Sequence, residues 1–171
     1  MKKAAEFFKR RGFIAIISDL YEDPEKIIDA VKPRRAKFCF EMMGWAIPHS
    51  PDVYLKLIKA VGAKNVKLHL DTFHMNIEEK NQHDAIVKAG KHLGHFHACG
   101  SDRGTPGNDH LDWPGIAAAL RDIRYDGDVV IESFTPDVKV IARAAAIWRR
   151  IEPTREQIAV NGLRFLKKNL K

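Results

Sequence analysis

Short runs of β-branched and aromatic residues alternate with longer stretches whose apolar residues recur at helical spacing. This alternation constrains the fold more than any other feature of the chain. Strands that alternate with helices are typical of a parallel sheet with helices packed outside it, so we expect an α/β protein of about five βα units. The pattern predicts strands over residues 13–20, 36–42, 65–73, 95–100 and 128–134, and helices over residues 22–32, 50–62, 83–94, 112–127, 140–151 and 154–170.

The length of the chain limits the architectures that this pattern allows. Its 171 residues are enough for one domain with a core, and no linker or low-complexity segment divides them, so we expect a single domain over residues 1–171. Two architectures fit: an open doubly wound sheet, or part of a (β/α)8 barrel. A whole barrel needs about 250 residues and eight strands, which this chain is too short to supply.

Each of the last four predicted strands ends in a residue that is unusual for a strand that only fills a core. Glu41, Asp71, His97 and Glu132 are 30, 26 and 35 positions apart, about one βα unit each. Because the carboxyl ends of parallel strands meet at the edge that carries the active site, we expect the four side chains to converge there. Two Glu, one Asp and one His form a mostly oxygen ligand set that suits Mn²⁺ or Mg²⁺, and also Co²⁺, better than a structural zinc.

Each of these residues also has a simpler interpretation. A single acidic residue at a strand end is usually a helix cap or a surface ion pair, and a single His in a strand is usually a core residue with its hydrogen bonds satisfied. Equivalent positions in four consecutive units favour the metal interpretation. His95 and His69 share the faces of His97 and Asp71, and we interpret both as supporting residues rather than ligands.

Two further residues are candidates for contact with a substrate. His74 follows Asp71 by three residues, in the stretch HLDTFHMNIEE. Arg103 lies in the long polar loop GSDRGTPGNDHLDW, which is too elaborate for a simple connection. Its guanidinium could clamp a hydroxyl or phosphate oxygen at the mouth of the site, although a surface Arg in a flexible loop is the alternative.

The charge and the cysteine content of the chain limit the kinds of partner and the cellular compartment that we expect. The net charge is +7, but the basic residues fall in small groups without interleaved aromatics, so we expect no nucleic-acid partner. No apolar run approaches the ~20 residues of a membrane span, and the N-terminus lacks the apolar core of a signal peptide. We therefore expect a cytoplasmic protein with no membrane partner. One disulfide between Cys39 and Cys99 is possible, but two reduced, buried thiols fit that compartment better.

The stretches LDTFHMNIEE, GHFHACGSDRGTPGNDHLDW and DVVIESF resemble the ketose 3-epimerases of the D-tagatose/D-psicose type, which belong to the xylose-isomerase-like TIM-barrel superfamily. Several motifs match in the right order and at the right spacing, from about Lys37 to the C-terminus. The stretch KFCFEMMGWAIPHSPDVYLKLI is closer to another branch of that superfamily. The resemblance therefore implies a metal-dependent epimerase or isomerase of a small-molecule sugar, and leaves the sugar open.

The resemblance also implies a role for each candidate residue. Glu41 and Glu132 match glutamates that bind the metal and act in catalysis, and Asp71 and His97 match the other two metal ligands. His74 and Arg103 match residues that hold the sugar. In such enzymes one glutamate takes the proton from carbon 3, an enediolate forms, and the other glutamate returns a proton on the opposite face. The metal, most often Mn²⁺, holds two adjacent sugar oxygens.

The resemblance covers only the C-terminal half of an eight-stranded barrel. We expect residues 32–171 to form that half, and residues 1–31 to be a βα unit from outside the family. A chimeric, designed or reconstructed chain, or a fragment, would have this arrangement. A half-barrel leaves two open sheet edges and an exposed apolar interior, in which we place Phe38, Phe40, Leu70 and Ile131. We therefore expect a homodimer in which two copies close on each other, and an open sheet with helices on both faces is the alternative. The alternative to an active epimerase is a catalytically inactive half-barrel that folds and oligomerises without turnover.

Overall fold

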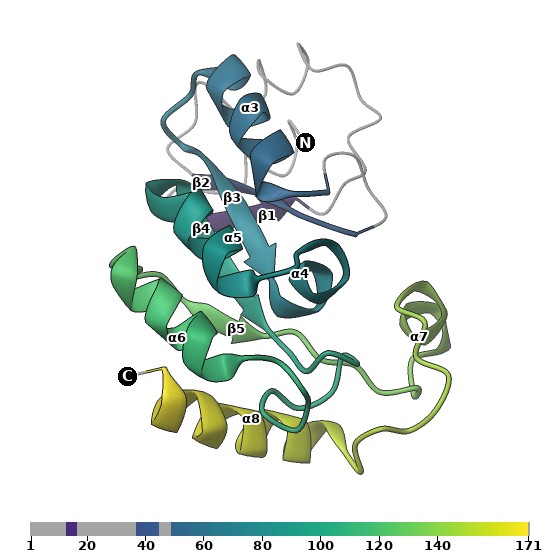
Figure 1. Ribbon diagram of the computed structural model, residues 1–171. Helices are drawn as coiled ribbons and strands as arrows, with labels where there is room; N and C mark the ends of the chain where they lie inside the picture. The colour runs from purple at the N-terminus through teal and green to yellow at the C-terminus, as the bar shows by residue number, and fades with distance from the viewer. Residues whose placement is uncertain (1–12, 17–36, 45–48, 171) are drawn as a thin grey trace.

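Five parallel strands form one sheet in chain order in the computed structural model, which describes residues 13–16, 37–44 and 49–170 (Figure 1). Each strand pairs in parallel with the next, so all five carboxyl ends lie at one edge. The expected helix over 22–32 and the boundary at residue 31 lie outside the described residues. The strands are β1 (Phe13–Ile16), β2 (Lys37–Glu41), β3 (Val66–Asp71), β4 (Leu93–Ala98) and β5 (Val129–Ile131).

Helices α3, α5 and α6 lie along one side of the sheet, and α7 lies apart from them (Figure 1). Helix α5 packs against both α3 and α6, and α8 packs against α6 and β5. None of the described helices is long and apolar enough to cross a membrane, and the cytoplasmic location stays a prediction. The helices are α3 (Pro51–Val61), α4 (Thr72–Glu78), α5 (Gln82–Ala89), α6 (Trp113–Asp122), α7 (Lys139–Ala144) and α8 (Arg155–Asn169), with a 3₁₀ turn η1 (Gly90–His92).

Both ends of α3 and the start of α6 lie where their local sequence predicts them. Pro51 occupies the first turn of α3, where its missing N–H costs nothing. Gly62 ends that helix in the left-handed conformation, with a φ of 65°, and donates its N–H to Ile58. Asp112 caps α6 by accepting a hydrogen bond from the backbone N–H of Gly115.

Several boundaries differ from those expected from the sequence. The helix expected over 112–127 ends at Asp122, and the strand expected over 128–134 ends at Ile131. The expected strand over 65–73 ends at Asp71, because the side chain of Asp71 caps α4, a short helix that the pattern did not indicate. The helix expected over 83–94 ends at Ala89, and β4 already begins at Leu93. The helix expected over 140–151 covers only Lys139–Ala144.

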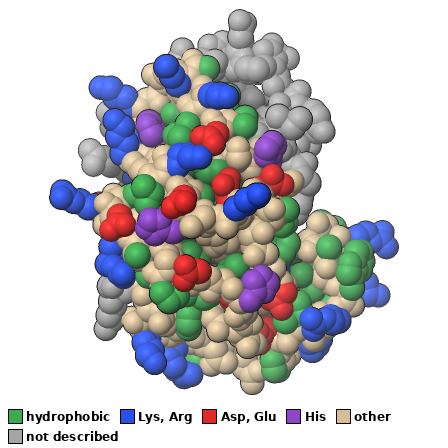
Figure 2. Space-filling view, viewed as in Figure 1, with side chains coloured by type: hydrophobic (Ala, Val, Ile, Leu, Met, Phe, Trp, Pro, Cys, Tyr) green, Lys and Arg blue, Asp and Glu red, His purple; other side chains and the backbone are tan. Residues whose placement is uncertain are grey.

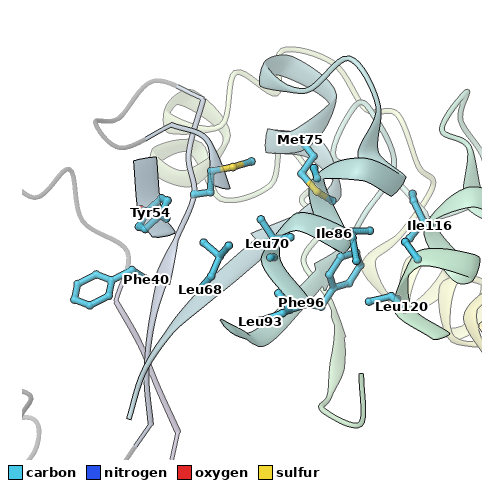
Figure 3. Packing of buried hydrophobic residues seen from close by; sticks show 14 of the residues in the cluster. Phe40, Tyr54, Leu68, Leu70, Met75, Ile86, Leu93, Phe96, Ile116 and Leu120 are labelled. Atoms are coloured by element: carbon cyan, nitrogen blue, oxygen red, sulfur yellow. The ribbon is translucent and has the colours of Figure 1, made fainter. Parts of the chain in front are cut away.

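The hydrophobic core lies between the sheet and the helices. Leu68, Leu70 and Phe96 point from the strands toward Ile86 and Ile116 on the helices, and all five are fully buried (Figure 3). Phe38 and Phe40 belong to the same cluster.

This core corrects one expectation about the sheet. The sequence suggested that Phe38, Phe40, Leu70 and Ile131 face the inside of a half-barrel and need cover from a second copy. In the structure the first three are already buried in this core, and Ile131 packs against the same cluster. The reason is alternation: Glu41 and Asp71 point to the opposite face, so their sequence neighbours point to the helices.

Charged residues are spread over the surface. Figure 2 shows Lys and Arg side chains distributed over the visible face, with Asp and Glu side chains between them. Both cysteines are buried, free thiols. The preferred interpretation of Cys39 and Cys99 as reduced thiols therefore agrees with the structure.

Candidate metal centre and substrate pocket

Four side chains from four neighbouring strands meet at the carboxyl edge of the sheet. Glu41 ends β2, Asp71 ends β3, His97 lies in β4, and Glu132 directly follows β5. One potential ligand atom from each lies within 4.8 Å of those from the other three. The pairing of Asp71 with His97 across β3 and β4 explains part of this convergence, because paired residues point to the same face of a sheet.

His97 lies at the middle of three carboxylates. Its Nδ1 atom is 3.5 Å from Glu41 Oε1, 3.7 Å from Asp71 Oδ2 and 3.4 Å from Glu132 Oε2. Burial lowers the pKa of His97, but the three carboxylates outweigh burial and raise the pKa to about 11. In the metal-free protein, His97 is therefore protonated and is one of the positive partners of the acidic cluster.

Glu41 is more deeply buried than Glu132, the other glutamate of the cluster. Burial raises its pKa, and the nearby charges of Glu132 and Asp71 raise it further, while His97 opposes them. The hydroxyl of Tyr54 donates to the backbone carbonyl of Glu41 and fixes the end of β2. Among the described residues, Glu41 Oε1 and His97 Nδ1 are buried without a hydrogen-bond partner. Buried polar atoms in native proteins nearly always have one, so these two atoms fit a bound cation between them.

Asp71 is both a helix cap and a member of the charged cluster, the two roles that its sequence position allowed. Its Oδ1 atom caps α4 by accepting from the backbone N–H of Phe73 at 2.7 Å and of His74 at 3.4 Å. Its Oδ2 atom faces the cluster and accepts from Arg103 at 2.7 Å. Burial raises the pKa of Asp71, but His97 and Arg103 outweigh it and hold the pKa well below its usual range. Asp71 is therefore both a helix cap and an ionised member of the site.

Arg103 lies inside the cluster rather than at its mouth, where the sequence placed it. Its side chain is only 4% exposed, and Nη1 donates to Asp71 and, at 2.8 Å, to Glu132. The guanidinium carbon lies 4.3 Å above the ring of Phe73. The buried carboxylates draw this charge inward, because an uncompensated buried acid is costly.

The backbone of Arg103 is specially held to allow this position. Its φ of 67° is left-handed, a conformation that a residue with a long side chain rarely adopts. Its N–H donates to Gly100 and its carbonyl accepts from the N–H of Phe134, both at 3.0 Å. The loop after β4 is thereby tied to the segment after β5, and such strain is typical of functional loops.

His74 is buried against Arg103. Its Nε2 atom lies 2.8 Å from Nη2 of Arg103. Burial lowers the pKa of His74 to about 4, with Arg103 acting in the same direction and Asp71 against it. His74 is therefore a neutral imidazole at neutral pH, and its Nδ1 atom also faces the backbone N–H of Gly44, at 3.3 Å.

A pocket of about 180 Å³ opens beside the cluster. Glu41, His74, Arg103 and Glu132 form its polar part. Its apolar wall consists of Met43, Phe134 and three residues in and just after α7, Ile141, Ala144 and Ala145. The sequence analysis missed the contribution of α7, because the apolar residues of a short surface helix do not indicate which site they border.

A polar contact holds the ends of β3 and β4 together beneath the site. The hydroxyl of Thr72 donates to the carbonyl of Cys99 at 2.7 Å and accepts from the N–H of Cys99 at 2.9 Å. Sequence reasoning missed Thr72 as well. Its position between Asp71 and His74 was the available signal, but only the fold shows that it faces Cys99.

Comparison with known proteins places this geometry in a family. A sequence model of the xylose isomerase-like TIM barrel family matches residues 3–169. The matched range includes residues 3–31, which the sequence analysis left outside the resemblance. A Synechocystis protein named "Probable ketose 3-epimerase" is 45% identical over 113 residues, which are 66% of this chain and 39% of that protein. The D-psicose 3-epimerase of Agrobacterium fabrum is 49% identical over 92 residues, 54% of this chain and 32% of the relative.

Solved structures agree with the sequence match. The D-psicose 3-epimerase of Clostridium cellulolyticum H10, solved with D-tagatose, aligns with a TM-score of 0.79 at 28% identity, over 94% of this chain and 65% of that one. The chain thus spans only about a third to two fifths of the two curated relatives, and its sheet corresponds to part of a barrel. The protein belongs to the xylose isomerase-like TIM barrel family.

Proposed function

We propose that the protein is a divalent-metal-dependent epimerase that acts on carbon 3 of ketoses. The observation that carries this proposal is that three carboxylates and one imidazole converge beside a pocket. Two of their atoms, Glu41 Oε1 and His97 Nδ1, are buried without a hydrogen-bond partner among the described residues. Matched relatives named as ketose or D-psicose 3-epimerases support the reaction class.

The four converging residues fit a divalent ion. Glu41, Asp71, Glu132 and His97 would hold it, with three oxygen donors and one nitrogen donor. Such a set suits Mn²⁺, and also Mg²⁺ or Co²⁺. When bound, the ion supplies positive charge that stabilises the negative charge developing on the sugar.

The two glutamates would exchange the proton at carbon 3. Glu132 accepts a hydrogen bond from Arg103, which suits a carboxylate that removes the proton. Glu41, which lies on a different strand and is more deeply buried, would return a proton on the opposite face of the planar enediolate. Two carboxyl groups in different environments thus divide the roles of base and acid.

The other pocket residues would bind and shield the sugar. Neutral His74 and the guanidinium of Arg103 offer hydrogen bonds to hydroxyl groups. Met43, Phe134 and Ile141 would exclude water from one side of the sugar.

A second candidate function is a metal-binding half-barrel without turnover. The observation that favours it is the short coverage of the curated relatives, because a complete barrel supplies contacts from all eight strands.

Two sheet edges, on β1 and β5, have no partner strand among the described residues. We propose that a second copy covers these edges in a homodimer. Light scattering at micromolar concentration tests this proposal, and a monodisperse monomer would contradict it.

Purified protein separates the two functions. We expect about one Mn²⁺ per chain by elemental analysis, and interconversion of D-fructose and D-tagatose with their carbon-3 epimers by chromatography. Metal without turnover on any ketose would support the inactive half-barrel. Absence of both metal binding and turnover, in protein with a cooperative unfolding transition, would refute the metal centre itself.

A further inference from the structure

A second group of metal-binding side chains lies beside the carboxylate cluster, and an irregularity in the sheet creates it. Leu68 pairs with Leu93, but the next residue, His69, pairs with His95. Gly94 is therefore an extra residue in β4, a β-bulge. Regular pairing would have placed His69 opposite Gly94, so the bulge brings two histidines face to face.

The three imidazoles of His69, His95 and His97 form a compact group. Their ring centroids are 4.8 Å apart for His69 and His95, 4.0 Å for His69 and His97, and 5.0 Å for His95 and His97. One ring nitrogen from each lies within 4.8 Å of those of the other two. Nitrogen atoms this close can share one ion after small side-chain rotations.

His69 lacks the hydrogen bonds that a core histidine needs. It is completely buried, and neither of its ring nitrogens has a hydrogen-bond partner among the described residues. A histidine that serves only packing would pair at least one nitrogen, because a buried unpaired polar group is unfavourable. Its Nε2 atom lies 3.8 Å from Oε1 of Glu41, which also lacks a hydrogen-bond partner among the described residues.

We propose that His69, His95 and His97 form an imidazole site for a borderline divalent ion such as Zn²⁺ or Cu²⁺, next to the carboxylate centre and sharing His97 with it. Imidazole favours Zn²⁺, Cu²⁺ and Ni²⁺, whereas carboxylate oxygens favour Mg²⁺ and Mn²⁺. Glu41 borders both groups, at 3.8 Å from His69 Nε2 and 3.5 Å from His97 Nδ1. Because the two sets share His97, Zn²⁺ competes with Mn²⁺, and the site makes the protein sensitive to zinc. This inference does not depend on epimerase activity.

The test uses Cu²⁺ as a spectroscopic probe of the full chain. Electron paramagnetic resonance of protein with one equivalent of Cu²⁺ resolves the number of nitrogen ligands. We expect three in the wild type. The His95→Phe variant removes a member of the imidazole group only, and we expect at most two nitrogens and a loss of Cu²⁺ affinity of about tenfold or more. His95→Gln, a polar replacement, provides the same test if the Phe variant does not fold.

Two controls separate this site from other metal binding. Glu132→Gln alters the carboxylate group only, so the three-nitrogen signal should persist. His83→Gln removes a surface histidine that lies beside Asp84 and Asp122, and the signal should again be unchanged. A single-nitrogen signal in the wild type that His95→Phe leaves unchanged would place the ion at the carboxylates and overturn the proposal. Absence of Cu²⁺ binding to folded protein, as expected if only water fills the group, would also overturn it.

Discussion

The two faces of the same sheet differ sharply in what they bury. The face toward the helices buries aliphatic and aromatic side chains such as Leu68, Leu70 and Phe96. The opposite face buries ionisable ones, such as Asp71 and His97, and they alternate with the apolar residues along the same strands. One face stabilises the fold by removing apolar surface from water, and the other accepts costly polar burial where chemistry is proposed.

Residues that stabilise the core and residues that form the charged cluster are adjacent in the sequence. Leu70 and Asp71 are neighbours, yet one belongs to the core and the other to the charged cluster. A substitution on one face should therefore change the free energy of unfolding and leave the site intact. A substitution on the other should change chemistry with little effect on stability. The following predictions test that separation, from the largest expected effect to the smallest.

On the polar face, Glu132→Gln should reduce epimerisation by about 10²–10⁴-fold, because an amide can neither remove nor return the proton at carbon 3. The free energy of unfolding should hardly change, since the amide oxygen can still accept from Arg103. Turnover by chromatography and urea denaturation give the two readouts. Glu156→Gln, at an exposed helix position, is the matched control. Equal turnover in Glu132→Gln and the wild type would remove Glu132 from the catalytic assignment.

On the apolar face, Leu70→Ala should lower the free energy of unfolding by about 2–5 kcal/mol, because it leaves a cavity in a fully buried position. Mn²⁺ affinity of the folded fraction should stay close to that of the wild type. Leu163→Ala, at a half-exposed position on α8, should cost far less. A large loss of Mn²⁺ affinity with unchanged stability would mean that the two faces are not separable.

The bulge that links the faces gives a smaller effect. A Cβ on Gly94 would lie 2.5 Å from Cβ of Lys67 and 2.7 Å from Sγ of Cys39, so Gly94→Ala should cost about 1–3 kcal/mol of stability. Adding Cys39→Ala removes one of the two close contacts and should restore part of the loss. Denaturation curves of the single and double variants measure this. If Gly94→Ala is as stable as the wild type, the close packing at the bulge is absent.

The smallest change is expected in the reactivity of the thiols. Burial raises the pKa of Cys39 to about 12 and also raises the pKa of Cys99, so neither thiol ionises near neutral pH. A thiol reagent at pH 8 should label neither cysteine in native protein and both after denaturation. Rapid labelling of Cys39 in native protein would show that the polar face is open to solvent at that position.

Much of this arrangement could be predicted from the sequence, and the failures have physical causes. The strand-end pattern placed Glu41, Asp71, His97 and Glu132 together because the register of parallel strands is regular. The inward position of Arg103 could not be predicted, since it depends on the left-handed backbone of a loop and on charges from other strands.

The helix-facing position of Phe40 was deducible and was nevertheless assigned wrongly. It is the direct neighbour of Glu41, so alternation places it on the opposite face. The role of His69 was hidden for another reason. Its neighbour on β4 is set by the bulge at Gly94, which shifts the register by one residue. The alternation of apolar residues in the sequence does not indicate this bulge.

The most direct test of the central claim is hydrogen exchange at carbon 3 of a ketose. Mn²⁺-loaded protein would be incubated with D-fructose or D-tagatose in D₂O, and deuterium at each carbon followed by NMR. The account predicts deuterium at carbon 3 in both epimers with the wild-type protein and none above background with Glu132→Gln. Folded, Mn²⁺-loaded wild-type protein that leaves carbon 3 of every ketose unlabelled would contradict the claim that this edge of the sheet is an epimerase site.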